Sequence, residues 1–236
     1  MENGGRILWN RVSHFCHIFR REGIFMKLDL PIELEDGTVE IATKKMDFAA
    51  FCRLYQDRER FLPYCRECPN YGTVWSCPPL PFDSGEYFRP YREILVFCAR
   101  ITLNPLVIER ADTPELVKKK GYEIVIRVKK QLEDHLRKME EEFPHSHSLS
   151  SGGCNRCCRC ARAKGDPCRK PAIMRYSLDA FGFDLTSIAK DLFGYDIEWC
   201  RDRLPAHFTL IHALLLPAGS LNFLGNQQDF SRKARM

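Results

Sequence analysis

A closely spaced run of cysteines constrains this chain more than any other feature of its sequence. Cys154, Cys157 and Cys160 are separated by two residues each, and Cys168 follows after seven more. Cys158 lies inside the run but breaks its spacing. Because loop side chains at such intervals can converge, we expect the first three and Cys168 to act together, with Cys158 as a bystander.

An earlier segment carries a second group of cysteines. Cys65, Cys68 and Cys77 lie in the Pro- and Gly-rich segment 62–85, and a proline directly follows two of them. Such punctuation predicts no regular secondary structure there. A structureless loop of this length in a compact domain usually has a function or a cross-link.

Two kinds of metal centre compete for these sulfurs. Structural zinc takes four ligands around one ion, often from two Cys-x2-Cys knuckles, and neither loop cleanly supplies a second knuckle. A Cys-x2-Cys-x2-Cys run instead opens the bacterial ferredoxin pattern, although there the fourth cysteine follows after three residues. The spacing therefore favours one or two 4Fe–4S clusters, with zinc as the alternative cofactor.

The second cysteine loop, 150–175, is strongly basic. From Cys154 to Arg175 it holds seven Lys and Arg residues against one acid, Asp166. Four thiolates around a cluster leave a net negative site, which nearby cations stabilise. A four-cysteine zinc site has the same need, and a solvated basic loop is the plain alternative, so charge does not separate these interpretations.

The first loop has only three cysteines, so a fourth ligand has to come from elsewhere. The candidates are Cys158, Cys98, His145, His147 or a non-protein ligand. The two histidines alternate in a short polar stretch, which is also typical of an exposed turn or strand edge.

The remaining cysteines and histidines have ordinary structural explanations. Cys52, Cys98 and Cys200 lie in apolar surroundings, where a free cysteine packs as a small hydrophobe. His207 and His212 lie on a predicted strand, and we expect them to be hydrogen-bonded residues of the core or edge.

Apolar periodicity predicts an α/β fold: a single domain with a central sheet, flanking helices and two cysteine-rich metal-binding loops. The run 93–101 is typical of a buried central strand, and steps of three and four across 125–143 mark one helix face. On that helix, Glu133 and Arg137 form an i,i+4 pair. The predicted elements are a hairpin of 32–34 and 39–42, helices 47–61, 114–143 and one ending at Gly194 with Ser177 or Asp184 as its cap, and strands 93–101 and 207–217.

The domain is predicted to span 26–221, between a doubtful or disordered leader, 1–25, and a polar tail, 222–236. Met26 begins a stretch that reads like a natural start, and purine-rich codons for Arg-Arg-Glu-Gly directly precede it. Residues 1–25 are therefore either a translated ribosome-binding region or an ordinary basic extension.

Length and composition exclude several classes of protein. The chain has 236 residues with 44% hydrophobic and 28% charged, which is typical of a folded domain. No segment approaches the roughly 20 apolar residues of a membrane span, and the N-terminus lacks a secretory signal. Twelve cysteines without such a signal indicate metal binding in the reducing cytoplasm. A net charge of +5 is too mild to predict nucleic-acid binding.

The two cysteine blocks resemble the signatures of an uncharacterised bacterial and archaeal family of predicted metal-binding proteins, a domain of unknown function. The first reads Cys-x2-Cys-x2-Tyr-Gly-x2-Trp-x-Cys-Pro-Pro. The second reads Cys-x2-Cys-x2-Cys, then Pro-Cys-Arg-x-Pro, Arg-x-Ser and Ala-x-Gly-x-Asp. The resemblance covers about 45–216, leaves Cys158 outside the pattern and has Tyr176 where a proline is expected. It implies metal binding and supplies no reaction. The residues that it implies as ligands are Cys65, Cys68, Cys77, Cys154, Cys157, Cys160 and Cys168.

We therefore expect a metal-binding protein with a redox, electron-transfer or cluster-based enzymatic role. Its partner would be a redox protein or a small-molecule substrate. A zinc-stapled binding module and a metal carrier or sensor are the alternatives, and no phosphate-binding or hydrolase motif is present. Arg175, Ser177 and Tyr71 are candidates for hydrogen bonding around the ligands, with loop and cap hydrogen bonds as the competing explanation.

Overall fold

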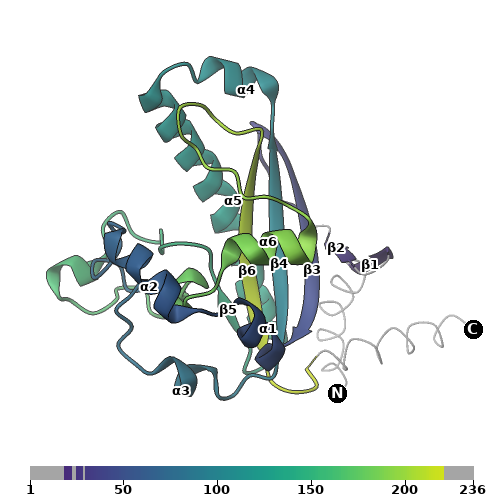
Figure 1. Ribbon diagram of the computed structural model, residues 1–236, viewed down its shortest axis with the longest axis vertical. Helices are drawn as coiled ribbons and strands as arrows, with labels where there is room; N and C mark the ends of the chain where they lie inside the picture. Colours follow the sequence, from purple (N-terminus) through teal and green to yellow (C-terminus); the bar gives the residue numbers. More distant parts are fainter. Residues whose placement is uncertain (1–18, 23–24, 29, 221–236) are drawn as a thin grey trace, which may run out of the picture.

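The computed structural model describes residues 19–22, 25–28 and 30–220, and its centre is one antiparallel sheet (Figure 1). The strands lie in the order β1-β2-β3-β4-β6-β5. Each neighbouring pair is antiparallel, so the long strands β3, β4 and β6 form a continuous central ladder. Their bounds are Phe19–Glu22 (β1), Phe25–Leu28 (β2), Gly37–Asp47 (β3), Glu93–Leu103 (β4), His147–Leu149 (β5) and His207–Leu216 (β6).

Helices cover both faces of this sheet (Figure 1). α5 (Pro114–Glu142) packs on one face, where its buried residues join side chains of β4 and β6 in one hydrophobic core. α1 (Phe48–Tyr55) and α6 (Leu185–Phe193) pack on the other face in a second core. The predicted α/β fold is therefore confirmed. Because β4 and β6 are buried on both faces, their sequences are nearly continuous apolar runs.

Shorter helices connect these layers. They are α2 (Arg58–Glu67), α3 (Ser84–Phe88), α4 (Pro105–Arg110) and the 3-10 helices η2 (Ala161–Lys164) and η3 (Asp179–Phe181). Figure 1 shows α2 and the second cysteine loop projecting together from one side of the sheet.

The predicted central strand, last strand, long helix and last helix are confirmed. Thr113 caps α5 by accepting a hydrogen bond from the amide of Leu116 at 3.3 Å. Asp184, rather than Ser177, caps α6. That helix ends at Gly194, whose φ of 72° lies in the left-handed region that favours glycine.

The predicted hairpin is wrong, because residues 32–34 form no strand and β3 pairs with β2 and β4. The backbone of Glu33 is satisfied by Gln131 of α5 instead. The amide of Glu33 donates to Gln131 Oε1, and Gln131 Nε2 donates to the Glu33 carbonyl, both at 2.9 Å. A side chain thus takes the place of the expected partner strand.

The predicted helix 47–61 is broken into two. Asp57 starts α2 by accepting a hydrogen bond from the amide of Arg60 at 3.0 Å. Gln56, which lies between the helices, forms an isolated bridge with Phe183. The first cysteine loop therefore begins on a helix, which corrects the prediction that 62–85 has no regular structure.

β1 precedes Met26, inside the stretch predicted as a leader. Residues 1–18 and 221–236 lie outside the described residues, so the division into 1–25, 26–221 and 222–236 stays a prediction. Among the described residues, no helix is long and apolar enough to cross a membrane.

Candidate metal centre

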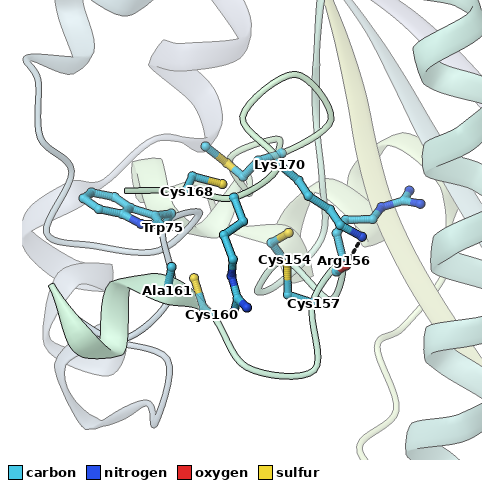
Figure 2. A pocket seen from close by; sticks show the side chains of 10 residues that line it. Trp75, Cys154, Arg156, Cys157, Cys160, Ala161, Cys168 and Lys170 are labelled. Carbon is cyan, nitrogen blue, oxygen red and sulfur yellow. Dashed lines mark hydrogen bonds between the residues drawn. The ribbon is translucent and has the colours of Figure 1, made fainter. Parts of the chain in front are cut away.

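Four cysteines of the second loop line one small cavity (Figure 2). They are Cys154, Cys157, Cys160 and Cys168. The cavity has a volume of about 20 Å³, room for little more than a water molecule. Arg169 and Met174 line it too, so a multi-iron cluster needs these flexible side chains to move outward.

Cys158 does not line this cavity and is exposed. Cys168 is brought to the other three although seven residues separate it from Cys160. The fold therefore groups the cysteines as their spacing predicts. Their assignment as ligands stays a prediction.

Basic side chains surround the four-cysteine cavity. Arg156, Arg169 and Lys170 line it. Lys170 Nζ donates to the Arg156 carbonyl at 3.0 Å, and Arg169 donates to the Arg159 carbonyl. These contacts fold the loop back on itself and keep positive charge beside the sulfurs, which suits a net negative thiolate site.

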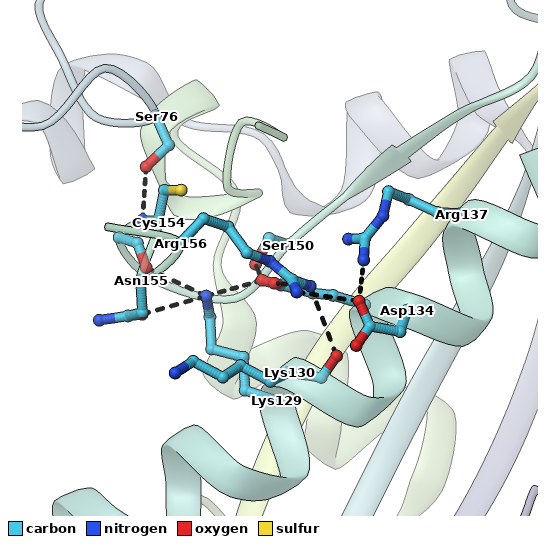
Figure 3. A network of polar contacts seen from close by, with 12 residues as sticks. Ser76, Lys129, Lys130, Asp134, Arg137, Ser150, Cys154, Asn155 and Arg156 are labelled. Carbon is cyan, nitrogen blue, oxygen red and sulfur yellow. Dashed lines mark hydrogen bonds and ion pairs between the residues drawn. The ribbon is translucent and has the colours of Figure 1, made fainter. Parts of the chain in front are cut away.

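A buried ionic network on α5 holds the start of this loop (Figure 3). Lys129 is only 3% exposed and donates to Glu133 Oε1 at 2.7 Å, to the Gly153 carbonyl at 3.0 Å and to Asn155 Oδ1 at 3.3 Å. Arg156 donates to Glu133 Oε2 at 2.8 Å. Burial alone raises the pKa of Glu133, but the charge of Lys129, the neighbouring His212 and the hydrogen bonds from Lys129 and Ser150 together lower that pKa to about 2.

His212 of β6 lies fully buried next to this network. Neither of its ring nitrogens has a hydrogen-bond partner among the described residues, so the expectation of a hydrogen-bonded core histidine is wrong. Burial lowers its pKa to about 3, which keeps the ring neutral at physiological pH. His207 does have a partner, since its Nδ1 lies 3.1 Å from Thr102 Oγ1.

The three cysteines of the first loop lie on a different cavity, with a volume of about 730 Å³. Cys65 belongs to α2, Cys68 caps the end of that helix, and Cys77 is buried. Burial raises the pKa of Cys65 and raises that of Cys77 to about 12. The thiols of Cys65 and Cys77 are thus protonated at neutral pH, and a metal bound by them would displace those protons.

The two cysteine loops interlock. Arg162 of the second loop donates to the carbonyls of Val74 at 3.0 Å, Cys77 at 2.6 Å and Pro79 at 2.5 Å. Its guanidinium also lies 5.0 Å from the centre of the Trp75 ring. One charged side chain of the second loop therefore fixes the backbone of the first.

A three-residue strip, Trp75 to Cys77, lies between the two cavities. Trp75 lines the four-cysteine cavity, while Cys77 lines the large one. Between them, Ser76 is fully buried and accepts a hydrogen bond from the amide of Cys154 at 2.7 Å (Figure 3). Its hydroxyl also lies 3.8 Å from Cys77 Sγ. The two cysteine sites are thus in direct structural contact.

Two glycines permit this close packing. A Cβ at Gly153 would lie 2.6 Å from Asn70 Nδ2, and one at Gly182 would lie 2.7 Å from the Arg58 backbone. Gly182 also has a φ of 79°. A side chain at Gly153 would displace the Asn70 side chain of the first loop, and one at Gly182 would collide with the backbone of α2, which leads into that loop.

The other candidates for a fourth ligand of the first loop line neither cavity. Cys98 is fully buried in the sheet core, Cys158 and His145 are exposed, and His147 packs edge-on against Tyr87.

Cys52 and Cys98 pack in the core as predicted. Cys200, predicted to pack as well, is exposed and lines the large cavity.

The three predicted hydrogen-bonding residues are placed differently. Arg175 pairs with Glu140 of α5 and lines neither cavity, so it pins the end of the second loop. Ser177 is buried, and its hydroxyl has no partner among the described residues. Tyr71 does line the large cavity.

Sequence reasoning missed several residues that shape the two sites. The interlocking Arg162 was counted only as loop charge. Glu133 was assigned to a pair with Arg137, whereas it binds Lys129 and Arg156, and Arg137 pairs with Asp134. One signal in the sequence indicates the buried ion pair: Lys129 and Glu133 interrupt the apolar face of the long helix four residues apart.

All eleven cysteines in the described part of the chain are free. Within the same residues, no three His, Cys, Asp or Glu side chains converge closely enough to hold a single metal ion. The sulfurs are gathered around cavities rather than around one point.

A comparison with protein families matches residues 53–216 to DUF2284, described as a predicted metal-binding protein. This stretch includes both cysteine groups and the helix that anchors the second loop. Searches of curated proteins and of solved structures gave no match.

Proposed function

The chain belongs to the DUF2284 family of predicted metal-binding proteins, as its cysteine blocks predict, and we propose that it is an iron–sulfur protein with two unequal sites. Cys154, Cys157, Cys160 and Cys168 would hold a complete 4Fe–4S cluster, and the other three cysteines would hold a second cluster with one iron free of protein ligands. When bound, such groups supply electron transfer at the first site and Lewis-acid or redox chemistry at the second.

One observation carries this proposal: the cysteines divide four and three between two separate cavities, and the group of three opens on the larger one. A site with three protein ligands leaves a coordination position for a substrate, the arrangement that distinguishes catalytic from structural metal sites. A volume of about 730 Å³ lies within the range of small-molecule binding sites.

The spacing of the cysteines favours a cluster over zinc. A Cys-x2-Cys-x2-Cys run opens the ferredoxin pattern, and neither loop cleanly supplies the two knuckles typical of structural zinc.

The surrounding side chains have distinct tasks in this proposal. Arg156, Arg169 and Lys170 offset the negative charge at the four-cysteine site. Ser76 and the buried strip around it keep the two sites in contact and exclude water between them. Tyr71 and the rest of the large cavity hold the substrate.

This function implies a small-molecule substrate and a redox partner protein, in the reducing cytoplasm where thiols persist. A zinc-stapled binding module and a metal carrier are the rival functions. Neither explains why three of the cysteines open on a cavity large enough for a substrate.

Purification without oxygen tests the proposal. We expect a coloured protein with about eight irons and eight acid-labile sulfides per chain, as two 4Fe–4S clusters require. A colourless protein with stoichiometric zinc and no sulfide would overturn it. Iron and sulfide near half of these values, unchanged in Cys77→Ser, would show that the first loop holds no cluster.

A further inference from the structure

The large cavity is lined by three strongly exposed aromatic side chains of the described residues. Among the described residues, the exposed large hydrophobic side chains include three rings: Tyr64 at 66%, Tyr122 at 60% and Trp199 at 69% exposure. All three line this cavity. They come from α2, α5 and the segment before β6, so the fold brings them together from distant parts of the chain. Grouped exposed rings with no role in the core are typical of a ligand-binding surface.

The charge of the cavity is opposite to that of the chain. Its described lining residues include three carboxylates, Asp179, Asp184 and Glu198. No Lys, Arg or His is among these lining residues. The chain as a whole carries a net charge of +5, and the neighbouring four-cysteine cavity is lined by basic residues. The lining of this cavity therefore carries net negative formal charge, and Arg60, 3.9 Å from Asp184 Oδ2, lies outside it.

Two of the three carboxylates have capacity left for a ligand. Asp179 uses Oδ1 to accept the amide of Gly152 at 3.1 Å, and its Oδ2 has no hydrogen bond within the described residues. Glu198 is exposed and forms no hydrogen bond or ion pair in that same part of the chain.

The third carboxylate argues against an anionic ligand. Asp184 caps α6 by accepting from the amide and hydroxyl of Ser187, at 3.0 and 2.9 Å. The positive end of that helix is thus already occupied by a carboxylate. No other described group in the cavity lining carries positive charge.

We propose that the large cavity binds a small organic cation, a protonated amine or quaternary ammonium group on an apolar or aromatic body. The carboxylates neutralise the charge, and the rings of Tyr64, Tyr122 and Trp199 contact the cation through their faces. The inference names the substrate class of the proposed three-cysteine site and to that extent rests on the proposed function. Asp179 connects the two, because its carbonyl accepts the Cys65 thiol at 3.8 Å.

Three small probes that share a benzyl group and differ in charge test the inference. They are benzyltrimethylammonium, N-benzylacetamide and phenylacetate, titrated by calorimetry into the protein purified without oxygen. We expect the cation to bind about tenfold more tightly than either other probe, which is the upper range of a cation–π contribution with carboxylate support. Equal or tighter binding of the neutral or anionic probe, or no binding of any probe at 10 mM as a rough upper limit, would overturn it.

Charge-neutral variants locate the site. Asp179→Asn and Glu198→Gln should each weaken the cation about threefold and leave the neutral probe unchanged, as expected for partly exposed charges. Asp196→Asn is the matched control, because Asp196 lies two residues from Glu198, pairs with Lys190 and does not line the cavity. Equal losses in Asp196→Asn and Glu198→Gln would contradict the assignment. Glu198 is exposed, so its variant remains informative if Asp179→Asn fails to fold.

Iron and sulfide are measured on the same samples. If they are absent while the cation preference holds, the proposed cluster is wrong and the cavity assignment stands. If both clusters are present and the probes show no preference for the cation, the cavity assignment alone is wrong.

Discussion

The two cysteine sites are neighbours with opposite surroundings. The four-cysteine cavity has a volume of about 20 Å³ and is lined by Arg156, Arg169 and Lys170. The three-cysteine site opens on about 730 Å³, lined by aromatic rings and carboxylates. A short strip, Trp75 to Cys77, separates them. The first cavity is small and basic, and the second is large, aromatic and acidic.

The same fold thus gives two neighbouring cysteine groups different volumes and opposite charges. The basic loop and its buried anchor on α5 form a small site with half-buried cysteines, while the acidic cavity lies between α2, α5 and α6. Most of the following changes affect one side of the comparison and leave the other as an internal control.

The largest expected effect follows removal of a sulfur at either site. Cys160→Ser should remove about four irons, one cluster, and retain the cluster at Cys65, Cys68 and Cys77. Cys77→Ser should do the reverse. Iron and sulfide analysis with visible spectra measures both. Cys158→Ser is the matched control, because Cys158 is exposed and lies outside both cavities; the same loss there would contradict the ligand assignment.

The next effect comes from the buried anchor of the second loop. Lys129→Met should destabilise the protein by about 3 kcal/mol, because it removes one of the two cations paired with the buried Glu133 and the buried donor to the Gly153 carbonyl. Iron should fall first at the four-cysteine site. Chemical denaturation and iron analysis measure the two changes. Lys190→Met removes an exposed pair with Asp196 and should cost less than about 0.5 kcal/mol; equal costs would show that the α5 network is not an anchor.

Acid should lower the stability of the fold through His212 and Glu133, which lie at the anchor of the second loop. His212 has a pKa of about 3 in the folded protein against 6.5 when unfolded, so the unfolded chain binds the additional proton between these values. Stability therefore falls as the pH drops from 6.5 towards 3, by roughly 3 kcal/mol between pH 7 and pH 4. Glu133, with its pKa lowered from 4.5 to about 2, adds a loss at lower pH.

Urea unfolding at pH 7 and pH 4 measures this acid effect. His212→Leu keeps a buried side chain and removes the titrating group, so its stability should change much less over that range. An identical loss in the wild type and the variant would assign the acid sensitivity elsewhere.

The smallest expected effect concerns the strip between the sites. Ser76→Ala removes the hydroxyl next to Cys77 Sγ and should lower the reduction potential at the three-cysteine site, since hydrogen bonds to cluster sulfurs raise it. Iron content should not change. Redox titration followed by electron paramagnetic resonance measures the shift. Ser177→Ala deletes a buried hydroxyl that has no partner within the described residues, and should leave the potential unchanged.

Local features of the chain made much of this molecule predictable. The apolar runs of β4 and β6, the Asp184 cap and the Gly194 stop each depend on neighbouring residues. The division of Cys154, Cys157 and Cys160 from Cys158 was also local, because spacing within one loop decides which side chains point the same way. The break at Gln56 was missed because its partner, Phe183, lies far along the chain.

The sequence by itself determined the α/β layers, the family and the two cysteine groups, because periodicity, caps and spacing are encoded over a few residues. Only the tertiary structure decided that the loops interlock through Arg162, that Glu133 turns inward to Lys129 and that Cys77 opens on an acidic, aromatic cavity. The Arg162 contacts join residues tens of positions apart, and Lys129 and Glu133, four apart on α5, are buried only once the second loop packs over them. Burial and neighbouring charge, which give these side chains their chemistry, arise only when the chain has folded.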